Sequence, residues 1–261
     1  MEFYDCRMRY GALINQRPYT TCETMCGLIT AIKRAGISGG LVYNYIADGM
    51  AACAGNDTLI NDIRVAAETN PEIKLFGAYT ILPSCTNESV PPNELPAYMK
   101  KNKLGAIRIN PSAHRYLAKA YVLGDYLQTA SDKKIPVMLD AGPIGYETGM
   151  SLDAADDYLN DFPELTAILY YDNVWPNDRF IRPMMKRYKN LYVNAAHFVV
   201  DGQFEETIGM FGDGRLLHGS SYPEMYMACG ILPIKHAEIK VESKIKIAGG
   251  NFIGLMEGWR A

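Results

Sequence analysis

The segment FYDCRMRYG, residues 3–11, has the length of a β-strand and ends at a glycine. Side chains in a strand alternate between its two faces, so three charged residues are expected to share one face: Asp5, Arg7 and Arg9. The other face then carries Tyr4, Cys6 and Met8 and is expected to meet helices. A charged face inside a fold is costly unless its ions are paired, so this strand predicts partners elsewhere in the chain.

Further segments of strand length follow, alternating with segments of helical period. The predicted strands are 2–9, 39–45, 73–80, 105–110, 135–140, 165–171, 191–196 and 215–219. The predicted helices are 22–35, 57–69, 93–101, 117–131, 152–160, 178–188 and 204–210, with a weaker helical region from 223 to 248 and beyond. Alternating units predict a parallel sheet, and eight units favour an α/β fold of the (β/α)8 TIM-barrel type, with residues 1–261 as a single domain.

Two helix starts have capping signals. Asn56 precedes the acidic Asp57 and is expected to cap the helix at 57–69, which Pro71 follows. Ser151 precedes Asp153 and is expected to cap the helix at 152–160.

Bulk composition gives no sign of a nucleic-acid or membrane partner. The chain is 48% hydrophobic and 21% charged, with a net charge of −3 and no Lys/Arg-rich block. It contains no apolar run of about 18 residues, and charges near its N-terminus argue against a signal peptide. Six cysteines are spread along a chain that is too long to need disulfides, so a cytoplasmic location is expected.

The active site of a TIM barrel lies at the carboxyl ends of its strands. There the order of motifs resembles the amidohydrolase superfamily, specifically its amidohydrolase-related branch, which includes decarboxylases and lactonases. That branch typically has D-x-H-x-H on the first strand, where this chain has Asp5-Cys6-Arg7-Met8-Arg9. It has histidine at the ends of strands 5 and 6, where this chain has Asp140 and Tyr171, and G-S-D-x-P at strand 8, where this chain has Gly219-Ser220-Ser221-Tyr222-Pro223. The resemblance thus implies a degenerate member that lacks the metal ligands.

Arginines stand at both ligand positions of the first strand. A guanidinium group is permanently cationic and has no lone pair to donate, so Arg7 and Arg9 would repel a divalent ion. Of the carried-over positions, Asp140 is the one plausible ligand. No metal and no other cofactor is therefore expected, and the zinc mechanism of the superfamily is disfavoured.

Two interpretations of the arginines remain open. In the first, Arg7 and Arg9 replace the charge of the metal and bind a small anion, with Arg108 as a third cation and Tyr171 and Ser221 as polar lining. In the second, Arg7 pairs with Asp140, and Arg9 pairs with Asp5 or Glu224, so that the ions only fill the former metal site.

Two residues are candidates for acid–base catalysis. Asp140 follows strand 5, although an adjacent arginine would lower its pKa and weaken it as a base. His197 follows strand 7 and is the better candidate. His218 is expected to point outward into the helix layer and to be structural.

Three functions follow. The first is a metal-independent hydrolase or lyase that acts on a small carboxylate-bearing molecule, similar to a pyrone dicarboxylate lactonase that binds substrate carboxylates with arginines. That relative has a basic aspartate where this chain has Ser221. The second is an inactive barrel that binds a small anion or a protein partner. The third retains a metal through Asp5, Asp140, Asp172 or His197. A homodimer is implied by the resemblance alone.

Overall fold

The computed structural model describes residues 1–11, 22–49, 51–142, 150–171 and 178–260. Eight parallel strands follow one another around the sheet in the order of the sequence. They are β1 (Tyr4–Tyr10), β2 (Gly39–Asn44), β3 (Lys74–Thr80), β4 (Leu104–Ile109), β5 (Val137–Ala141), β6 (Ala167–Tyr171), β7 (Leu191–Asn194) and β8 (Leu216–Leu217). The Cys6 and Arg9 amides donate to the carbonyls of His218 and Tyr222, at 2.9 and 3.0 Å, which joins β1 to the β8 segment. The predicted TIM-barrel fold is confirmed.

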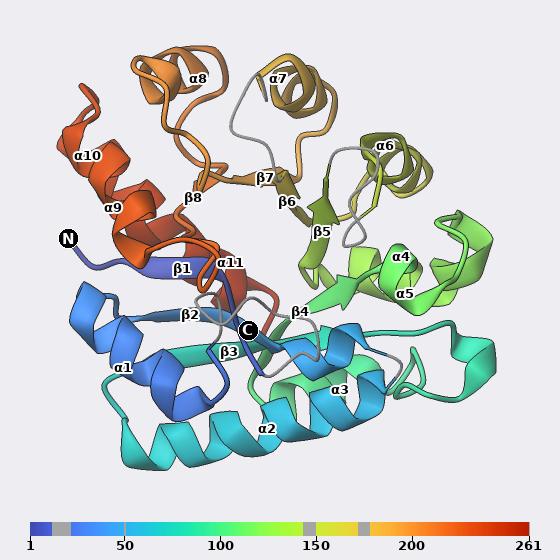
Figure 1. Ribbon diagram of the computed structural model, residues 1–261. Coiled ribbons are helices and arrows are strands. Elements are labelled where there is room, and N and C mark those ends of the chain that lie inside the picture. The colour runs from blue at the N-terminus through green and yellow to red at the C-terminus, as the bar shows by residue number, and fades with distance from the viewer. Residues whose placement is uncertain (12–21, 50, 143–149, 172–177, 261) are drawn as a thin grey trace.

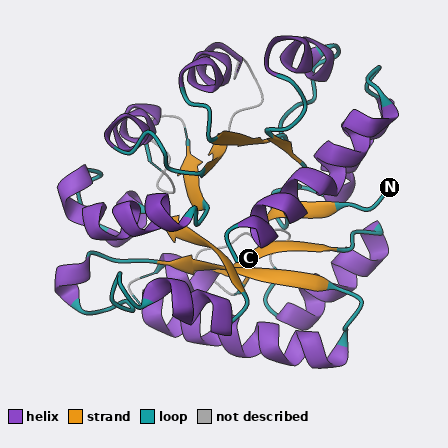
Figure 2. Cartoon of the chain, turned by 180° about the vertical axis from the view of Figure 1, so that it is seen from behind, coloured by secondary structure: helices purple, strands orange, loops and turns teal. Residues whose placement is uncertain are grey.

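Helices surround the sheet on its outer side (Figures 1 and 2), apart from α11, which packs against the end of the barrel. They are α1 (Met25–Ala35), α2 (Ala52–Thr69), α3 (Leu95–Lys101), α4 (Pro111–His114), α5 (Ala120–Lys133), α6 (Leu152–Asp161), α7 (Asp178–Arg187), α8 (Gln203–Phe211), α9 (Met227–His236), α10 (Val241–Ile245) and α11 (Asn251–Gly258). Shorter turns are η2 (Tyr45–Asp48), η3 (Ser84–Thr86) and η4 (Lys246–Gly250). No helix in these described ranges is long and apolar enough to cross a membrane.

The apolar core has two parts. The larger part fills the layer between the strands and the helices, and the smaller part fills the barrel interior. In the interior, Phe252 and Met256 of α11 pack among side chains from the strands. The indole nitrogen of Trp259, which follows α11, donates to the carbonyl of Gly105 at 3.0 Å. Helix α11 therefore covers part of the amino-terminal end of the barrel and leaves the carboxyl ends of the strands open for a site.

A bulge in β1 changes the predicted alternation of its side chains. Asp5 pairs with Gly40 but Met8 pairs with Val42, so three steps along β1 match two along β2. As a result Cys6 and Tyr4 pack with the barrel interior, and the prediction that they face the helices is wrong. Asp5 turns away from the barrel mouth, and its Oδ1 accepts from the amides of Arg7 and Ser220 at 2.9 and 3.2 Å.

The two predicted helix caps have different outcomes. Ser151 caps α6, since its hydroxyl oxygen accepts from the amide of Ala154 at 3.1 Å. The prediction for Asn56 is wrong, because α2 starts at Ala52 and buries Asn56 in its second turn. The Asn56 side chain instead donates to the carbonyl of Thr80 at 2.8 Å and accepts from its amide at 3.0 Å. These two hydrogen bonds connect α2 to the end of β3.

Candidate functional site

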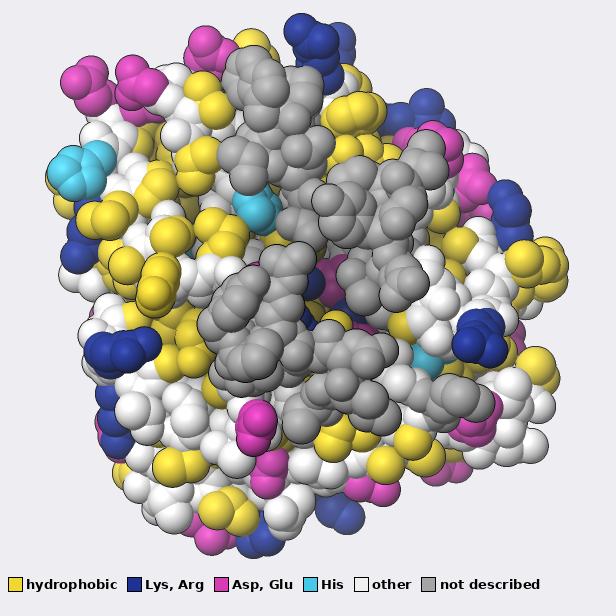
Figure 3. Space-filling model, in the orientation of Figure 1, with side chains coloured by type: hydrophobic (Ala, Val, Ile, Leu, Met, Phe, Trp, Pro, Cys, Tyr) yellow, Lys and Arg dark blue, Asp and Glu magenta, His cyan; other side chains and the backbone are white. Residues whose placement is uncertain are grey.

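A cavity of about 160 Å³ opens at the carboxyl ends of the strands. In Figure 3, basic and acidic side chains lie together in the hollow at the centre of this face. The lining residues are Arg7, Arg9, Tyr43, Tyr45, Asp48, Arg108, Asp140, Ala141, Tyr170, His197, Glu224 and Met225. Five of the seven site residues expected from the sequence therefore meet in one place: Arg7, Arg9, Arg108, Asp140 and His197.

Asp140 is the centre of a buried ion network. Its Oδ1 accepts from Nε of Arg7 at 3.2 Å, and its Oδ2 accepts from Nε and Nη2 of Arg108 at 3.1 and 3.0 Å. The remaining nitrogen of Arg108, Nη1, donates to Asp48 of η2. Burial by itself would raise the pKa of Asp140, but the guanidinium groups of Arg7 and Arg108 outweigh it and hold the pKa below its ordinary value. Asp140 is thus held ionised.

Arg9 is paired less completely. Its Nη2 contacts Oε1 of Glu224, in the loop that follows β8. Nε and Nη1 of Arg9 are buried and have no hydrogen-bond acceptor among the described residues. A buried donor without an acceptor is unusual in native proteins, so these two atoms call for an acceptor that the described residues do not supply.

Each arginine lies against a tyrosine ring. The guanidinium carbon is 3.8 Å from the ring centre of Tyr170 for Arg7, 4.0 Å from that of Tyr43 for Arg108 and 3.7 Å from that of Tyr45 for Arg9. Stacking of this kind stabilises the cation and fixes the plane of the guanidinium group. The donor directions of the three arginines are therefore set before any ligand binds.

Tyr170, rather than the predicted Tyr171, faces the cavity. In the register between β5 and β6, Asp140 lies beside Tyr170, so these two side chains share a face. Tyr171 is on the opposite face, in the outer core, with its ring 5.6 Å from that of Phe180. The hydroxyl of Tyr170 shares a 3.0 Å hydrogen bond with Nε2 of His197, which brings a phenol and an imidazole together at the cavity wall.

Ser221, the other residue expected to bind substrate, lies outside the cavity lining. Ser221 is fully buried after β8, and its φ of 57° marks a sharp turn of the chain. After this turn Glu224, and not Ser221, lines the cavity. His218 points into the helix layer as expected. Its ring lies 5.1 Å from that of Phe3, its Nδ1 is 3.1 Å from the carbonyl oxygen of Tyr4, and burial lowers its pKa.

The residues at this site do not fit a divalent metal. Arg7 and Arg9 offer donors where a metal needs lone pairs. Asp5 is engaged by backbone amides, and both oxygens of Asp140 are engaged by arginines. Among the described residues no group of three or more His, Cys, Asp or Glu side chains could hold a metal ion. Asp172, named above for an alternative metal site, lies outside the described residues.

The guanidinium and carboxylate charges of the described lining balance. Three guanidinium groups face three carboxylates, those of Asp48, Asp140 and Glu224. The pairing of Arg7 with Asp140 agrees with the second interpretation of the arginines, as does that of Arg9 with Glu224, whereas Asp5 is not its partner. A cavity nevertheless remains beside these pairs, so pairing and ligand binding are compatible here.

Some lining residues were not identified from the sequence. The strand period could have identified Tyr43, since it follows the interior residue Leu41 by two positions, and in the same way Tyr170 follows Ile168. Asp48 had no such signal because it belongs to the short turn η2, whose position depends on packing against α2.

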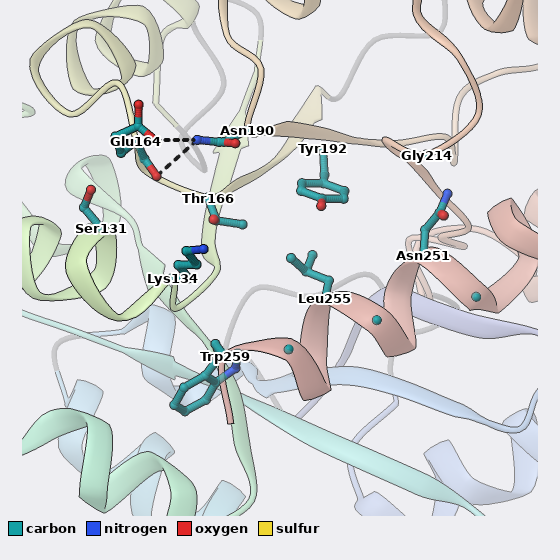
Figure 4. A pocket seen from close by; sticks show the side chains of 13 residues that line it. Ser131, Lys134, Glu164, Thr166, Asn190, Tyr192, Gly214, Asn251, Leu255 and Trp259 are labelled. Atoms are coloured by element: carbon teal, nitrogen blue, oxygen red, sulfur yellow. Dashed lines mark hydrogen bonds between the residues drawn. The ribbon is translucent and has the colours of Figure 1, made fainter. Parts of the chain in front are cut away.

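A larger cavity, about 610 Å³, lies at the opposite end of the barrel beside α11 (Figure 4). Asn251 and Leu255 of α11 lie on one wall, and the side-chain amide of Asn190 donates to Glu164 across from them. The arginine cavity is smaller but lies at the end where the βα loops of TIM barrels carry catalytic groups. It also contains the buried ions, so chemistry and topology select it as the functional site.

Solved structures with the same fold cover essentially the whole chain. An uncharacterized TIM-barrel protein from Bordetella bronchiseptica has 20% identity and a TM-score of 0.70, with 100% of both chains covered. A probable 2-pyrone-4,6-dicarboxylic acid hydrolase from Acinetobacter baumannii, with citric acid bound, has 15% identity and a TM-score of 0.66, covering 99% of this chain and 100% of its own.

A dihydroxybenzoic acid decarboxylase from a Polaromonas species, with bound manganese and the inhibitor 2-nitroresorcinol, has 13% identity and a TM-score of 0.69, covering 100% of this chain and 98% of its own. Structures described as amidohydrolases also match over 98% of this chain. No protein-family model and no curated protein matches the sequence. The expected resemblance to amidohydrolase-related barrels is confirmed at the level of the fold.

Proposed function

We propose that this barrel is a metal-independent hydrolase or lyase that acts on a small molecule carrying a carboxylate. The observation that carries the proposal is the state of Arg9, whose two buried nitrogens lack acceptors among the described residues. Arg9 lines the same cavity as Arg7. Arg7 donates to Asp140 from Nε, so its two Nη atoms take no part in that ion pair. A carboxylate placed between Arg7 and Arg9 would supply the missing acceptors through charge-assisted hydrogen bonds.

The arginines divide into two roles in this proposal. Arg108 already donates from all three guanidinium nitrogens, to Asp48 and Asp140, so it anchors the network. Arg7 and Arg9 keep donors that have no acceptor among the described residues, and in this proposal they bind the ligand. Asp140, which its neighbours hold ionised, is a weak base and positions Arg7 and Arg108.

His197 and Tyr170 are the proposed proton-transfer groups. They are hydrogen-bonded to each other, and both line the cavity. An imidazole can exchange a proton near neutral pH, and the phenol beside it can pass that proton toward a ligand. The cavity of about 160 Å³ is comparable to the roughly 150 Å³ pocket that accommodates benzene in an engineered protein, so a single small ring or a short chain fits.

The solved structures support this substrate class. Two neighbours with this fold are a probable dicarboxylic acid hydrolase with citric acid bound and a dihydroxybenzoic acid decarboxylase. Both concern small carboxylic acids, which agrees with the donors that Arg7 and Arg9 present. Hydrolysis of a lactone or amide and cleavage of a carbon–carbon bond both remain within the proposal.

A second candidate is a barrel that binds a small anion without turnover. The balance of three guanidinium groups against three carboxylates favours it, because an ion network of this kind stabilises a site whether or not chemistry occurs. The two candidates share the ligand and differ in the use of His197 and Tyr170.

Turnover of a panel of aromatic carboxylates, lactones and carboxylate-bearing amides tests the proposal. Protein purified without chelator should convert at least one compound, and the rate should be unchanged by EDTA. Arg9→Ala should abolish the activity, whereas Arg64→Ala, which alters an exposed pair with Glu68, should not. Binding without turnover would favour the second candidate, and activity that requires equimolar zinc or manganese would contradict both.

A further inference from the structure

Glu224 places a carboxylate on Arg9, the arginine proposed to bind the ligand. Its Oε1 lies on Nη2 of Arg9, yet the Glu224 side chain is 37% exposed while that of Arg9 is 8% exposed. Within the described part of the chain this is the one ion pair of the Glu224 carboxylate, and its charge also acts on Arg7. Glu224 lies in the segment that follows β8, whereas Arg9 belongs to β1.

The nitrogen of Arg9 that Glu224 contacts determines how a ligand carboxylate can bind the same guanidinium group. A carboxylate binds arginine most strongly by bridging two nitrogens, either Nε with Nη2 or Nη1 with Nη2. Nη2 belongs to both of these edges, and Glu224 occupies it. Nη2 carries two N–H groups, one on each edge, so Glu224 takes one edge at most, and its negative charge opposes a ligand carboxylate at the other.

The other two nitrogens of the Arg9 guanidinium group lack acceptors among the described residues. These nitrogens, Nε and Nη1, are buried, and the guanidinium plane lies 3.7 Å from the ring centre of Tyr45. The single contact with Glu224 thus leaves two buried donors unused. A bridging ligand would engage one of them together with Nη2.

We propose that Glu224 is a displaceable carboxylate that competes with an anionic ligand for Arg9 and moves aside when the ligand binds. This inference rests on the proposed function and adds a specificity device to it. When Glu224 moves aside, its ion pair with Arg9 is lost. A ligand carboxylate replaces that ion pair, whereas a neutral molecule of the same shape does not, so neutral molecules are rejected. The exposed Glu224 side chain has solvent to move into.

Isothermal titration calorimetry with citrate, malonate and benzoate as probes tests the inference. Glu224→Gln keeps the shape of the side chain and removes its negative charge. It should bind at least one probe about tenfold more tightly than the unaltered protein, which corresponds to about 1.4 kcal/mol. Arg9→Gln should bind none of them.

Glu88→Gln is the matched control, because Glu88 is exposed and the substitution makes the same change in net charge. It should bind as the unaltered protein does. Equal or weaker binding by Glu224→Gln, with normal binding by the unaltered protein, would overturn the inference and leave the proposed function standing. If neither protein binds any of the three probes, the proposed function fails and the inference fails with it.

A neutral probe separates displacement from a general gain in affinity. Benzamide resembles benzoate in shape but carries no charge. Glu224→Gln should increase binding of benzoate relative to that of benzamide, and circular dichroism should confirm that the variant is folded. An equal gain for both compounds would contradict displacement by a carboxylate.

Discussion

Nε of Arg7 lies 3.2 Å from Oδ1 of Asp140, and this contact joins β1 to β5 across the mouth of the barrel. Both side chains are about nine-tenths buried. One structure with this fold, a dihydroxybenzoic acid decarboxylase, contains bound manganese. Here a carboxylate shared by two guanidinium groups joins the strands instead.

Removing the charge of Asp140 should destabilise the fold strongly. Asp140→Asn leaves Arg7 and Arg108 buried without their common counter-charge, and the loss of one partner of a buried pair typically costs about 3–5 kcal/mol. Urea unfolding at pH 7 measures this free energy. Asp157→Asn, which removes an exposed partner of Lys119, should leave the midpoint unchanged, and similar midpoints for both variants would refute a buried network.

The same carboxylate predicts a pH dependence. The pKa of Asp140 is lower in the folded protein than in the unfolded chain, where an aspartate titrates near about 3.9. Its contribution to stability is therefore complete above about pH 5 and is lost as the pH falls through the folded pKa. The stability difference between the unaltered protein and Asp140→Asn should narrow from pH 7 to pH 3.5. A constant difference over that range would mean that Asp140 does not titrate as described.

Tyr170 and Tyr171 offer a matched test of the catalytic assignment. Tyr170→Phe removes the hydroxyl that is hydrogen-bonded to His197, whereas Tyr171→Phe removes one on the outer face of the same strand. For the substrate found in the turnover panel, Tyr170→Phe should lower kcat by about 10²–10⁴-fold, as for loss of general acid–base catalysis. Tyr171→Phe should have little effect. Equal rates for both variants would remove Tyr170 from the mechanism.

Gly55 should control the position of Asp48. A Cβ at Gly55 would lie 2.2 Å from the amide nitrogen of Ala47, so Gly55→Ala must push η2 away from α2. We expect a cost of about 1–3 kcal/mol and weaker ligand binding, because Asp48 would leave Arg108. Gly254→Ala is the control, since a Cβ there meets nothing within 4 Å among the described residues. It should raise stability by about 0.5–1 kcal/mol.

Asn56 provides a test of how α2 is attached to β3. Its side chain satisfies both the amide and the carbonyl of Thr80, so Asn56→Ala leaves two buried backbone groups without partners. The expected loss is roughly 2–4 kcal/mol of unfolding free energy. Asn61→Ala, on the exposed face of α2, should be nearly neutral in the same urea titration, and equal losses would contradict the buried role of Asn56.

The strand order, the barrel and the convergence of Arg7, Arg9 and Arg108 could be predicted because they depend on apolar period and on the order of motifs. The errors arise where packing overrides local pattern. The bulge in β1 moves Cys6 to the interior, and the register of β6 selects Tyr170 over Tyr171. Neither a bulge nor a register is visible in one strand taken alone.

The partners of the arginines were only partly predictable for the same reason. The pairing of Arg7 with Asp140 follows from their places at the carboxyl ends of β1 and β5. Asp48 reaches Arg108 from a short turn that no sequence period marks. Glu224 reaches Arg9 because the chain turns sharply at Ser221, whose backbone conformation a sequence motif alone does not reveal.

The central claim is that guanidinium groups hold a carboxylate where a related barrel would hold a metal. Anomalous diffraction from crystals grown with citrate, measured at the zinc and manganese absorption edges, tests it most directly. We predict a citrate carboxylate bridging Arg7 and Arg9, with no anomalous peak in the cavity. An anomalous peak among the strand ends, or an arginine cavity that stays without citrate at saturating concentration, would contradict the account.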